Sequence, residues 1–330
     1  VHPESYEVAS KLLEQLGYDV ASVSSGKLVG LGKKITDISG TASRLGVGEI
    51  TLADIVKELE KPGRDPREEM PKPVLRKDVL DMKDLKPGMT NRSVYERLLP
   101  GGKGLNVSTV LNNLGMDNIA LGFIAGFTGE EIKRRFEALG GRSDFIELRE
   151  GASRINVKIK SAAETEINAA GPVIDSGAVS QLMEKLNRLR DGDILILAGS
   201  IPASLSGSLY SDIMKMLSDR NILITVDAEK ELLLNALPYR PFLVKPNHYE
   251  LGEIFGVTLN TREEVVPYAR RLQEKGAKNV LVSMAGEGAV LAAETGLVLM
   301  NQAPRGTVRN SVGAGDSMVA GFIAGWCEKR

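Results

Sequence analysis

Residues 194–227 read ILILAGSIPASLSGSLYSDIMKMLSDRNILITVD and contain two short apolar runs, 194–198 and 222–226, on either side of a helical pattern at 209–217. Runs that are apolar throughout are typical of strands buried on both faces. Such strands, alternating with helices, predict a parallel sheet. In sheets of this kind, ligands bind beyond the carboxyl ends of the strands.

The same alternation extends through the chain from about residue 100. Further apolar runs of strand length lie at 119–124, 242–244 and 280–283, and further helical patterns at 130–139, 179–189 and 262–275. We therefore predict an α/β fold whose mostly parallel sheet has helices on both faces. Residues 153–169 differ, because Ile155, Val157 and Ile159 alternate with polar residues. This alternation predicts a half-exposed antiparallel hairpin, and a small β lid is a natural use for it.

The N-terminal part of the chain has a different character. Residues 1–60 contain Val8, Leu12 and Leu16 at helical spacing, so we predict a small helical segment there. Four prolines fall between residues 62 and 73, which favours extended backbone over packed structure. We predict that residues 61–86 form a Pro-rich linker.

Composition excludes several classes of protein. The chain has 330 residues and a net charge of −1, so no general binding of polyanions is indicated. One cysteine and two histidines exclude an internal disulfide and a Cys/His zinc cluster. No apolar run approaches the roughly 20 residues that span a bilayer, and no signal peptide opens the chain. We expect a cytoplasmic protein whose partners are small molecules, with no membrane association.

The segment Asn-Ser-Val-Gly-Ala-Gly-Asp at 310–316 has the composition of an anion hole with a base beside it. The backbone N–H groups of Gly313, Ala314 and Gly315 would lie at the start of a helix, where they can stabilise a phosphoryl group in transfer. Asp316 could then accept a proton from an attacking hydroxyl. The alternative is a Gly-rich turn in which Asp316 caps the helix.

Four other polar or Gly-rich segments fall where this architecture places loops. They contain, in order, Gly101, Gly102, Lys103 and Asn106; Ser200; Lys245, Asn247 and Glu250; and Ser283, Gly286 and Gly288. Glycine backbone, lysine and asparagine suit an oxygen-rich ligand, and Asn247 with Glu250 would share one face of a helical turn near a metal ion or phosphate. Taken singly, each has a simpler interpretation: a helix-entry turn, a turn closed by proline, a capping pair and a hairpin turn.

Taken together and in this order, Gly-Gly-Lys-Gly-Leu-Asn-Val-Ser at 101–108, the 245–250 segment and Val-Gly-Ala-Gly-Asp-Ser at 312–317 resemble the PfkB, or ribokinase-like, sugar kinases. Thr-Asn-Arg-Ser at 90–93, Ser-Arg-Ile-Asn at 153–156 and Val-Ser-Met-Ala-Gly at 282–286 are most similar to the branch of 1-phosphofructokinases and tagatose-6-phosphate kinases. The resemblance covers residues 87–330, and it implies a ribokinase-like domain over that range.

The resemblance also implies functions for the site residues. The family transfers the γ-phosphoryl group of ATP to a sugar-phosphate hydroxyl with Mg²⁺, which implies phosphorylation of fructose 1-phosphate, with tagatose 6-phosphate as the alternative acceptor. Asp316 would be the base, and Gly313, Ala314 and Gly315 the anion hole. Gly101, Gly102, Lys103, Asn106, Arg154 and Ser200 would hold the sugar phosphate. Lys245, Asn247 and Glu250 would serve ATP and Mg²⁺, with Glu250 acting on the metal through water, and Ser283, Gly286 and Gly288 would border the nucleotide. Lid hairpins of the family pair between subunits, which implies a homodimer.

The chain departs from the family at both ends. We find no counterpart of the first strand of the family, whose aspartate holds the sugar, nor of the helices that follow the Gly-Ala-Gly-Asp helix. Residues 74–80 are the candidate replacement for the missing strand. Val-His-Pro-Glu-Ser-Tyr at 1–6, Lys-Pro-Gly-Arg-Asp-Pro-Arg at 61–67 and Asp-Leu-Lys-Pro-Gly-Met at 84–89 instead resemble the Tex transcription accessory proteins. The matching stretch, residues 1–86, lies between their helix-hairpin-helix region and S1 domain, so we predict a chimera. The remaining alternatives are an inactive fragment and a nucleic-acid-binding protein, although residues 1–86 lack a basic excess.

Overall fold

The computed structural model describes residues 78–81, 85–93, 96–161, 164–202, 204–304, 306 and 313–328. The chain divides into two compact units, Val1–Lys72 and Pro73–Arg330. The first unit lies outside the described residues, and so do the helical segment predicted at 1–60 and most of the linker predicted at 61–86.

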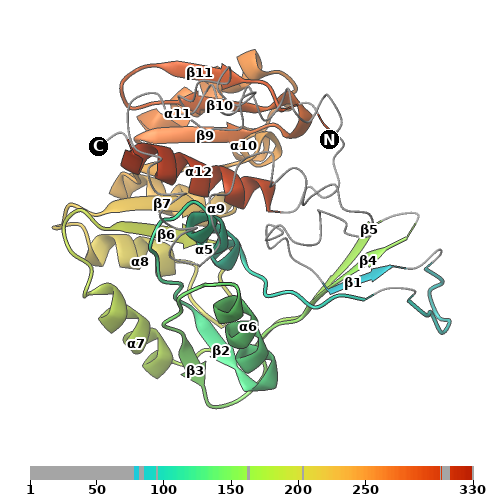
Figure 1. Ribbon diagram of the computed structural model, residues 1–330. Helices are drawn as coiled ribbons and strands as arrows, with labels where there is room; N and C mark the ends of the chain where they lie inside the picture. Colours follow the sequence, from blue (N-terminus) through green and yellow to red (C-terminus); the bar gives the residue numbers. More distant parts are fainter. Residues whose placement is uncertain are drawn as a thin grey trace, which may run out of the picture. The chain divides into compact units, whose positions relative to one another are not determined.

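A six-stranded sheet forms the centre of the second unit (Figure 1). Its strands, in spatial order, are β11 (Val298–Asn301), β10 (Ala289–Ala292), β9 (Asn279–Ser283), β8 (Leu243–Val244), β7 (Leu223–Asp227) and β6 (Ile194–Ala198). Strands β6 to β9 are parallel, whereas β10 and β11 are antiparallel to their neighbours. This arrangement confirms the mostly parallel sheet predicted from the apolar runs, including the hairpin turn between β9 and β10.

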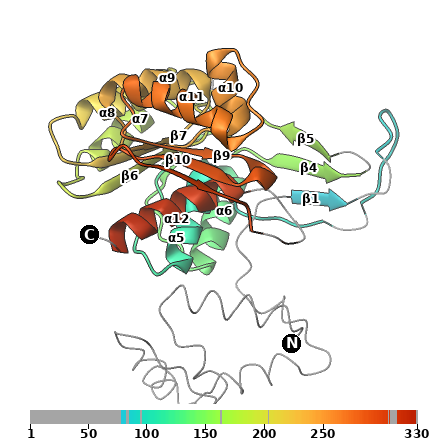
Figure 2. The same cartoon turned by 90° about the horizontal axis from the view of Figure 1, so that it is seen from above.

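Helices cover both faces of this sheet (Figure 2). One face carries α7 (Ser176–Leu186), α8 (Leu209–Met216), α9 (Lys230–Ala236), α10 (His248–Phe255) and α11 (Arg262–Glu274), and the other carries α5 (Lys103–Asn113) and α12 (Ala314–Glu328). Successive strand residues supply two cores: Ile224 and Val244 pack with α7 to α11, whereas Leu223 and Leu243 pack with α5 and α12. Burial on both faces explains why these strands are apolar throughout.

A separate two-stranded parallel sheet joins β2 (Phe123–Ala125) and β3 (Ile146–Leu148), with α6 (Gly126–Ala138) between them in the chain. Ile146 belongs to the same core as α7 and β7. Among the described residues, no strand pairs with the second edge of β6, nor with the second edge of β2. The central sheet is therefore interrupted among the described residues.

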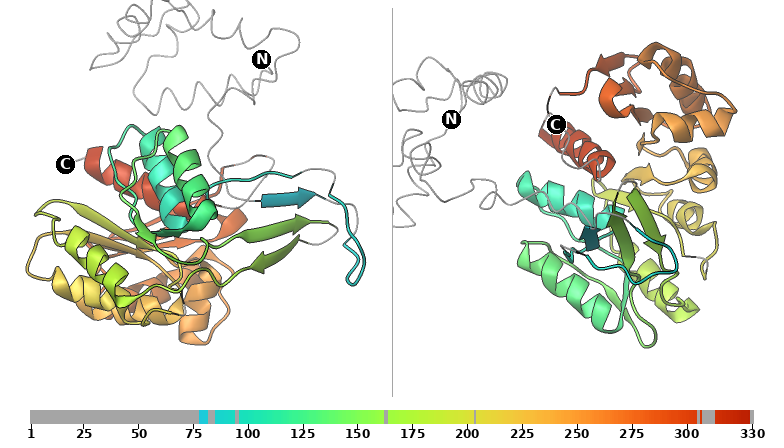
Figure 3. Two further views of the ribbon diagram at one scale, coloured as in Figure 1. Left: turned by 90° about the horizontal axis from the view of Figure 1, so that it is seen from below. Right: turned by 90° about the vertical axis from the view of Figure 1, so that its right-hand side faces the viewer.

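A three-stranded sheet projects from the α/β body (Figure 3). It contains β1 (Asp78–Asp81), β4 (Asn156–Lys160) and β5 (Glu164–Asn168). Strands β4 and β5 are antiparallel with Val157 opposite Ile167, which confirms the predicted hairpin. β1 pairs in parallel with β4. The prediction that residues 74–80 replace the missing central strand is therefore wrong for 78–80, because those backbone groups pair with the projecting sheet; residues 74–77 lie outside the described residues.

Candidate active site

A buried aspartate joins two lysines at the carboxyl ends of the parallel strands. Asp227 ends β7 and is 1% exposed, and its Oδ1 lies 3.1 Å from Lys103 Nζ and 3.5 Å from Lys245 Nζ. Lys103 opens α5, and Lys245 directly follows β8. A charge buried without a partner is costly, so the Asp227 carboxylate stabilises both ammoniums and is stabilised by them.

The charge of Lys103 is reinforced by the acids around it. Burial on its own would lower the pKa of Lys103, but the charge of Asp227 and its hydrogen bond, with further contributions from Glu250 and Asp316, raise that pKa above its ordinary value. Lys103 therefore carries its proton throughout the physiological pH range. A fixed cation at this position suits the binding of phosphate oxygens.

Asp316 lies in the first turn of α12 and is 5% exposed. Its Oδ2 accepts a hydrogen bond of 2.5 Å from Nδ2 of Asn106, which is itself buried in α5. A Cβ added at Gly315 would lie 2.9 Å from Lys245 Nζ, so the start of α12 approaches that ammonium closely and only glycine fits without a shift. The structure thus brings Lys103, Asn106, Lys245, Gly315 and Asp316 together; Asn310, Ser311 and Val312 lie outside the described residues.

Asn247 and Glu250 form a reciprocal cap on α10. The Asn247 side chain accepts from the Glu250 backbone N–H at 2.9 Å, and Glu250 Oε2 accepts from the Asn247 backbone N–H at 2.8 Å. The alternative of a capping pair is therefore present in the structure. It does not remove Glu250 from the site, because the charge of Glu250 contributes to the raised pKa of Lys103. Asn247 also forms an isolated parallel bridge with Ser283, which ends β9.

The two glycines after β9 differ in their surroundings. Gly286 is exposed in the 3₁₀ turn η3 (Ala285–Glu287), with open space where a side chain would be. Gly288 is buried with φ 94°, and a Cβ there would lie 2.0 Å from the carbonyl oxygen of Asn301. The close approach of two backbones therefore explains Gly288, whereas packing does not explain Gly286.

The remaining predicted residues are not joined to this cluster. Arg154 and Ser200 are exposed, and neither makes a hydrogen bond or an ion pair with any residue in the described ranges. Gly101 and Gly102 are also exposed, and Gly102 precedes α5 with φ 123°, a conformation that favours glycine. These four residues are therefore accessible to a ligand from solvent.

Sequence reasoning missed Asp227 and Tyr210. Tyr210, in α8, donates a hydrogen bond of 3.2 Å to the carbonyl of Gly199, next to Ser200. Burial, and then the charge of Asp227, raise the pKa of Tyr210, so its hydroxyl stays a neutral donor. The signal for Asp227 was its position immediately after the apolar run at 222–226, which places it at the carboxyl end of a strand.

The donor set fits magnesium that is held partly by phosphates. Asp227 Oδ2 and Asn106 Oδ1 are buried with no hydrogen-bond partner among the described residues, so a ligand or its water shell can satisfy them. In those same ranges, no cluster of three or more His, Cys, Asp or Glu side chains is placed to enclose a metal ion. Magnesium needs no such enclosure, because it is usually bound by one or two carboxylates together with substrate phosphates and waters.

A buried carboxylate beside one buried and one half-buried ammonium, at the carboxyl ends of a parallel sheet, can orient a hydroxyl and hold the phosphate that it attacks. Fold and site together define a phosphotransferase with an alcohol group as acceptor.

The comparisons with known proteins agree with this class. A family described as pfkB family carbohydrate kinase matches residues 78–330. The chain is 45% identical to 1-phosphofructokinase of Bacillus subtilis (strain 168), over 75% of this chain and 81% of that protein. It is 35% identical to D-tagatose-1-phosphate kinase of Bacillus licheniformis, over 73% and 79% of the two chains. The crystal structure of phosphofructokinase-2 from Escherichia coli in complex with fructose-6-phosphate superposes with a TM-score of 0.69 at 25% identity, covering 76% of this chain and 83% of that one. The chain therefore belongs to the pfkB family of carbohydrate kinases.

A second family, the HHH domain, matches residues 1–67. The sequence motifs predict the stretch that follows a helix-hairpin-helix region, whereas this match gives an HHH domain over residues 1–67. No described helix is long and apolar enough to cross a membrane.

Proposed function

We propose that this chain transfers the γ-phosphoryl group of ATP to the free primary hydroxyl of fructose 1-phosphate, giving fructose 1,6-bisphosphate. The observation that carries the proposal is the buried Asp316, oriented by Asn106 at the start of α12 and close to the cations Lys103 and Lys245. The relatives named 1-phosphofructokinase supply the acceptor.

In this proposal, Asp316 accepts the proton of the attacking hydroxyl. The backbone N–H groups of Gly313, Ala314 and Gly315 and the ammonium of Lys103 stabilise the charge on the phosphoryl oxygens. Gly101, Gly102, Asn106, Arg154 and Ser200 bind the sugar phosphate, and Lys245, Asn247, Ser283 and Gly286 bind ATP. Gly288 would border the nucleotide by allowing the close approach of its backbone to that of Asn301. Mg²⁺, which Glu250 through water and Asp227 Oδ2 would help to hold, offsets the charge of the transferred phosphates when bound.

The test is formation of fructose 1,6-bisphosphate from fructose 1-phosphate and ATP. Asp316→Asn should lower the rate by about 10² to 10⁴, the usual contribution of a general base. Asp219→Asn is the matched control, because Asp219 is exposed and away from the cluster. Full activity of folded Asp316→Asn would show that another group is the base.

The alternative acceptor is a tagatose phosphate. A relative is named D-tagatose-1-phosphate kinase, whereas the sequence motifs led us to tagatose 6-phosphate. A panel of fructose 1-phosphate and tagatose 1- and 6-phosphates, read by ADP release, separates these acceptors. If no acceptor stimulates ADP release while ATP still binds, the alternative of an inactive fragment holds.

The helix-hairpin-helix match makes nucleic-acid binding a second candidate function, with a Tex-like origin for residues 1–86. Salt-sensitive retention of single-stranded RNA on filters would support it.

The proposal also includes a homodimer and a cytoplasmic location. Exposed Ile155 and Ile167 on the lid support the homodimer, which light scattering can test. The use of ATP and the single cysteine fit the cytoplasm.

A further inference from the structure

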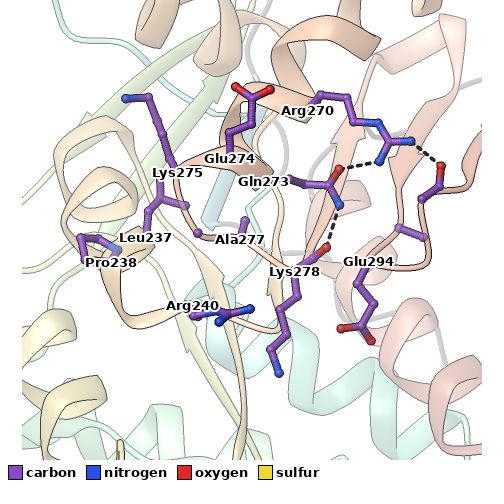
Figure 4. A pocket seen from close by; sticks show the side chains of 13 residues that line it. Leu237, Pro238, Arg240, Arg270, Gln273, Glu274, Lys275, Ala277, Lys278 and Glu294 are labelled. Atoms are coloured by element: carbon purple, nitrogen blue, oxygen red, sulfur yellow. Dashed lines mark hydrogen bonds between the residues drawn. The ribbon is translucent and has the colours of Figure 1, made fainter.

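A polar cleft lies near the amino-terminal end of β9, at the end of the strands opposite to the active site. Its volume is about 770 Å³, and it lies between η2 (Leu237–Tyr239), the end of α11, the entry to β9 and the turn after β10 (Figure 4). Lys278 precedes β9, whereas Ser283 ends it. Because the cleft lies at the amino-terminal end of β9 and the active site lies at its carboxyl end, a ligand in this cleft cannot be the one held by Asp316.

The walls of the cleft are fixed by hydrogen bonds. Gln273 Nε2 donates to the carbonyls of Lys278 at 2.8 Å and Ala292 at 3.2 Å, and Gln273 Oε1 accepts from Arg270 at 2.9 Å. Arg270 also donates to the Gly296 carbonyl. A Cβ added at Gly276 would lie 2.0 Å from the carbonyl oxygen of Leu237, so η2 and the end of α11 are in close backbone contact. The cleft is therefore formed before any ligand arrives.

The cleft carries positive charge that its own side chains do not neutralise. Arg240 and Lys278 make no hydrogen bond or ion pair through their side chains with any residue in the described part of the chain. Figure 4 shows Lys275 and Glu274 pointing away from Arg240 and Lys278. Glu294 is the one acid of the lining that points to the same side as Lys278, and its single negative charge does not balance the positive charges of Arg240, Lys278 and Arg270. Like charges gathered in one cleft repel one another, and a bound anion removes that repulsion.

Backbone conformation at Arg240 supports a functional role for its side chain. Arg240 has φ 53° and ψ 60°, and it is one of two non-glycine residues with positive φ in the described ranges. This conformation costs an arginine about 1–2 kcal/mol, which glycine or asparagine would largely avoid. Strain of this kind clusters at binding sites, where the position of the side chain matters more than its local cost.

We propose that this cleft is a second, non-catalytic binding site for a small organic phosphate. The planar guanidinium of Arg240 can bind two phosphate oxygens, and the ammonium of Lys278 adds a point charge beside it. The volume lies within the usual range for small-molecule sites. The charge is local, since the whole chain has a net charge of −1, so a site of this kind selects its ligand by geometry as well as by charge.

Competitive labelling of lysines on the full chain, read by peptide mass spectrometry, tests the proposal. Inorganic pyrophosphate, fructose 1-phosphate and AMP serve as separate ligands, which distinguishes a bare phosphate from a sugar phosphate and a nucleotide. At a concentration about tenfold above the dissociation constant, one of them should slow the labelling of Lys278 about tenfold. Labelling of Lys275 should not change, and this neighbouring lysine is the control within the same molecule.

Arg240→Gln should abolish the protection of Lys278, whereas Arg262→Gln, which removes an equal charge at the start of α11 and outside the cleft, should preserve it. Both variants should keep the phosphotransfer rate of the parent chain, because neither residue lies in the active site. Equal protection of Lys275 and Lys278, no protection by any of the three ligands, or protection that survives Arg240→Gln would overturn the proposal.

Discussion

Strands β6 and β7 are neighbours that both end at the active site, but they are supported differently. β7 pairs with β6 and β8, and all five of its residues are buried. β6 pairs with β7, and no other described strand joins its second edge; Ile194 and Ile196, which face α5 and α12, are half-buried. The residues at their ends follow this difference: Asp227 is 1% exposed and bonded to two lysines, whereas Ser200 is exposed.

The part of the site that contains Asp227 is therefore more preorganised than the part that contains Ser200. Asp227 ends β7 and Lys245 follows β8, two strands that are paired on both sides, so the geometry of this ion pair is present without substrate. The Ser200 loop follows a strand with one free edge, and half of the backbone groups of such a strand lack a ladder partner. We therefore expect changes at β7 and β8 to cost more than equivalent changes at β6.

The largest expected effect is that of Asp227→Asn. The substitution leaves the ammoniums of Lys103 and Lys245 close together without a balancing charge, and breaking a buried pair in this way costs about 3–5 kcal/mol. Urea unfolding measures this free energy. Ser200→Ala should stay within about 0.5 kcal/mol of the parent chain, as is usual for exposed positions. Equal losses in both variants would contradict the difference between the strands.

Truncation of core side chains should show the next largest effect. Leu243→Ala, in β8, removes a side chain that is 0% exposed, and we expect a loss of about 2–5 kcal/mol in unfolding free energy. Ile194→Ala, at the start of β6, removes a half-buried side chain and should cost clearly less. If Ile194→Ala proves as costly as Leu243→Ala, β6 is covered in solution by another part of the protein.

Hydrogen exchange can separate the two strands without mutation. A difference of about 1.4 kcal/mol in local opening free energy corresponds to a tenfold difference in exchange rate. We expect amides of β6 to exchange at least about tenfold faster than those of β7, with β9 as a second protected reference. Equal protection of β6 and β7 would mean that the free edge of β6 is paired.

The smallest effect should come from Tyr210→Phe, which removes the hydrogen bond to Gly199 at the end of β6. We expect a loss of about 0.5–1.5 kcal/mol. The substitution should also change the pH dependence. The pKa of Tyr210 is raised in the folded chain, so above about pH 10 the unfolded chain loses a proton that the folded chain keeps, and stability falls as pH rises. The Phe variant should lose stability less steeply there, and an unchanged slope would contradict this.

The sequence by itself predicted most of the elements that position the site. The apolar run at 194–198 coincides with β6, and the runs at 222–226 and 280–283 differ from β7 and β9 by one residue at an end. These strands could be predicted because a strand buried on both faces needs apolar residues throughout. Spacing also placed the capping pair Asn247 and Glu250 at the start of a helix. Gly315 and Asp316 were likewise placed at a helix start, since glycine and acid at that position are local signals.

Tertiary structure alone decided which of those residues meet. Asn106 and Asp316 are 210 positions apart, and Lys103 and Asp227 are 124 apart, so no local pattern could pair them. The partner of β1 was equally non-local: the apolar Val79 and Leu80 suited a vacancy in the central sheet, yet the backbone of β1 pairs with β4. Local composition determines what a segment can form, whereas long-range backbone pairing and the burial of charges determine where it lies and with which residues it acts.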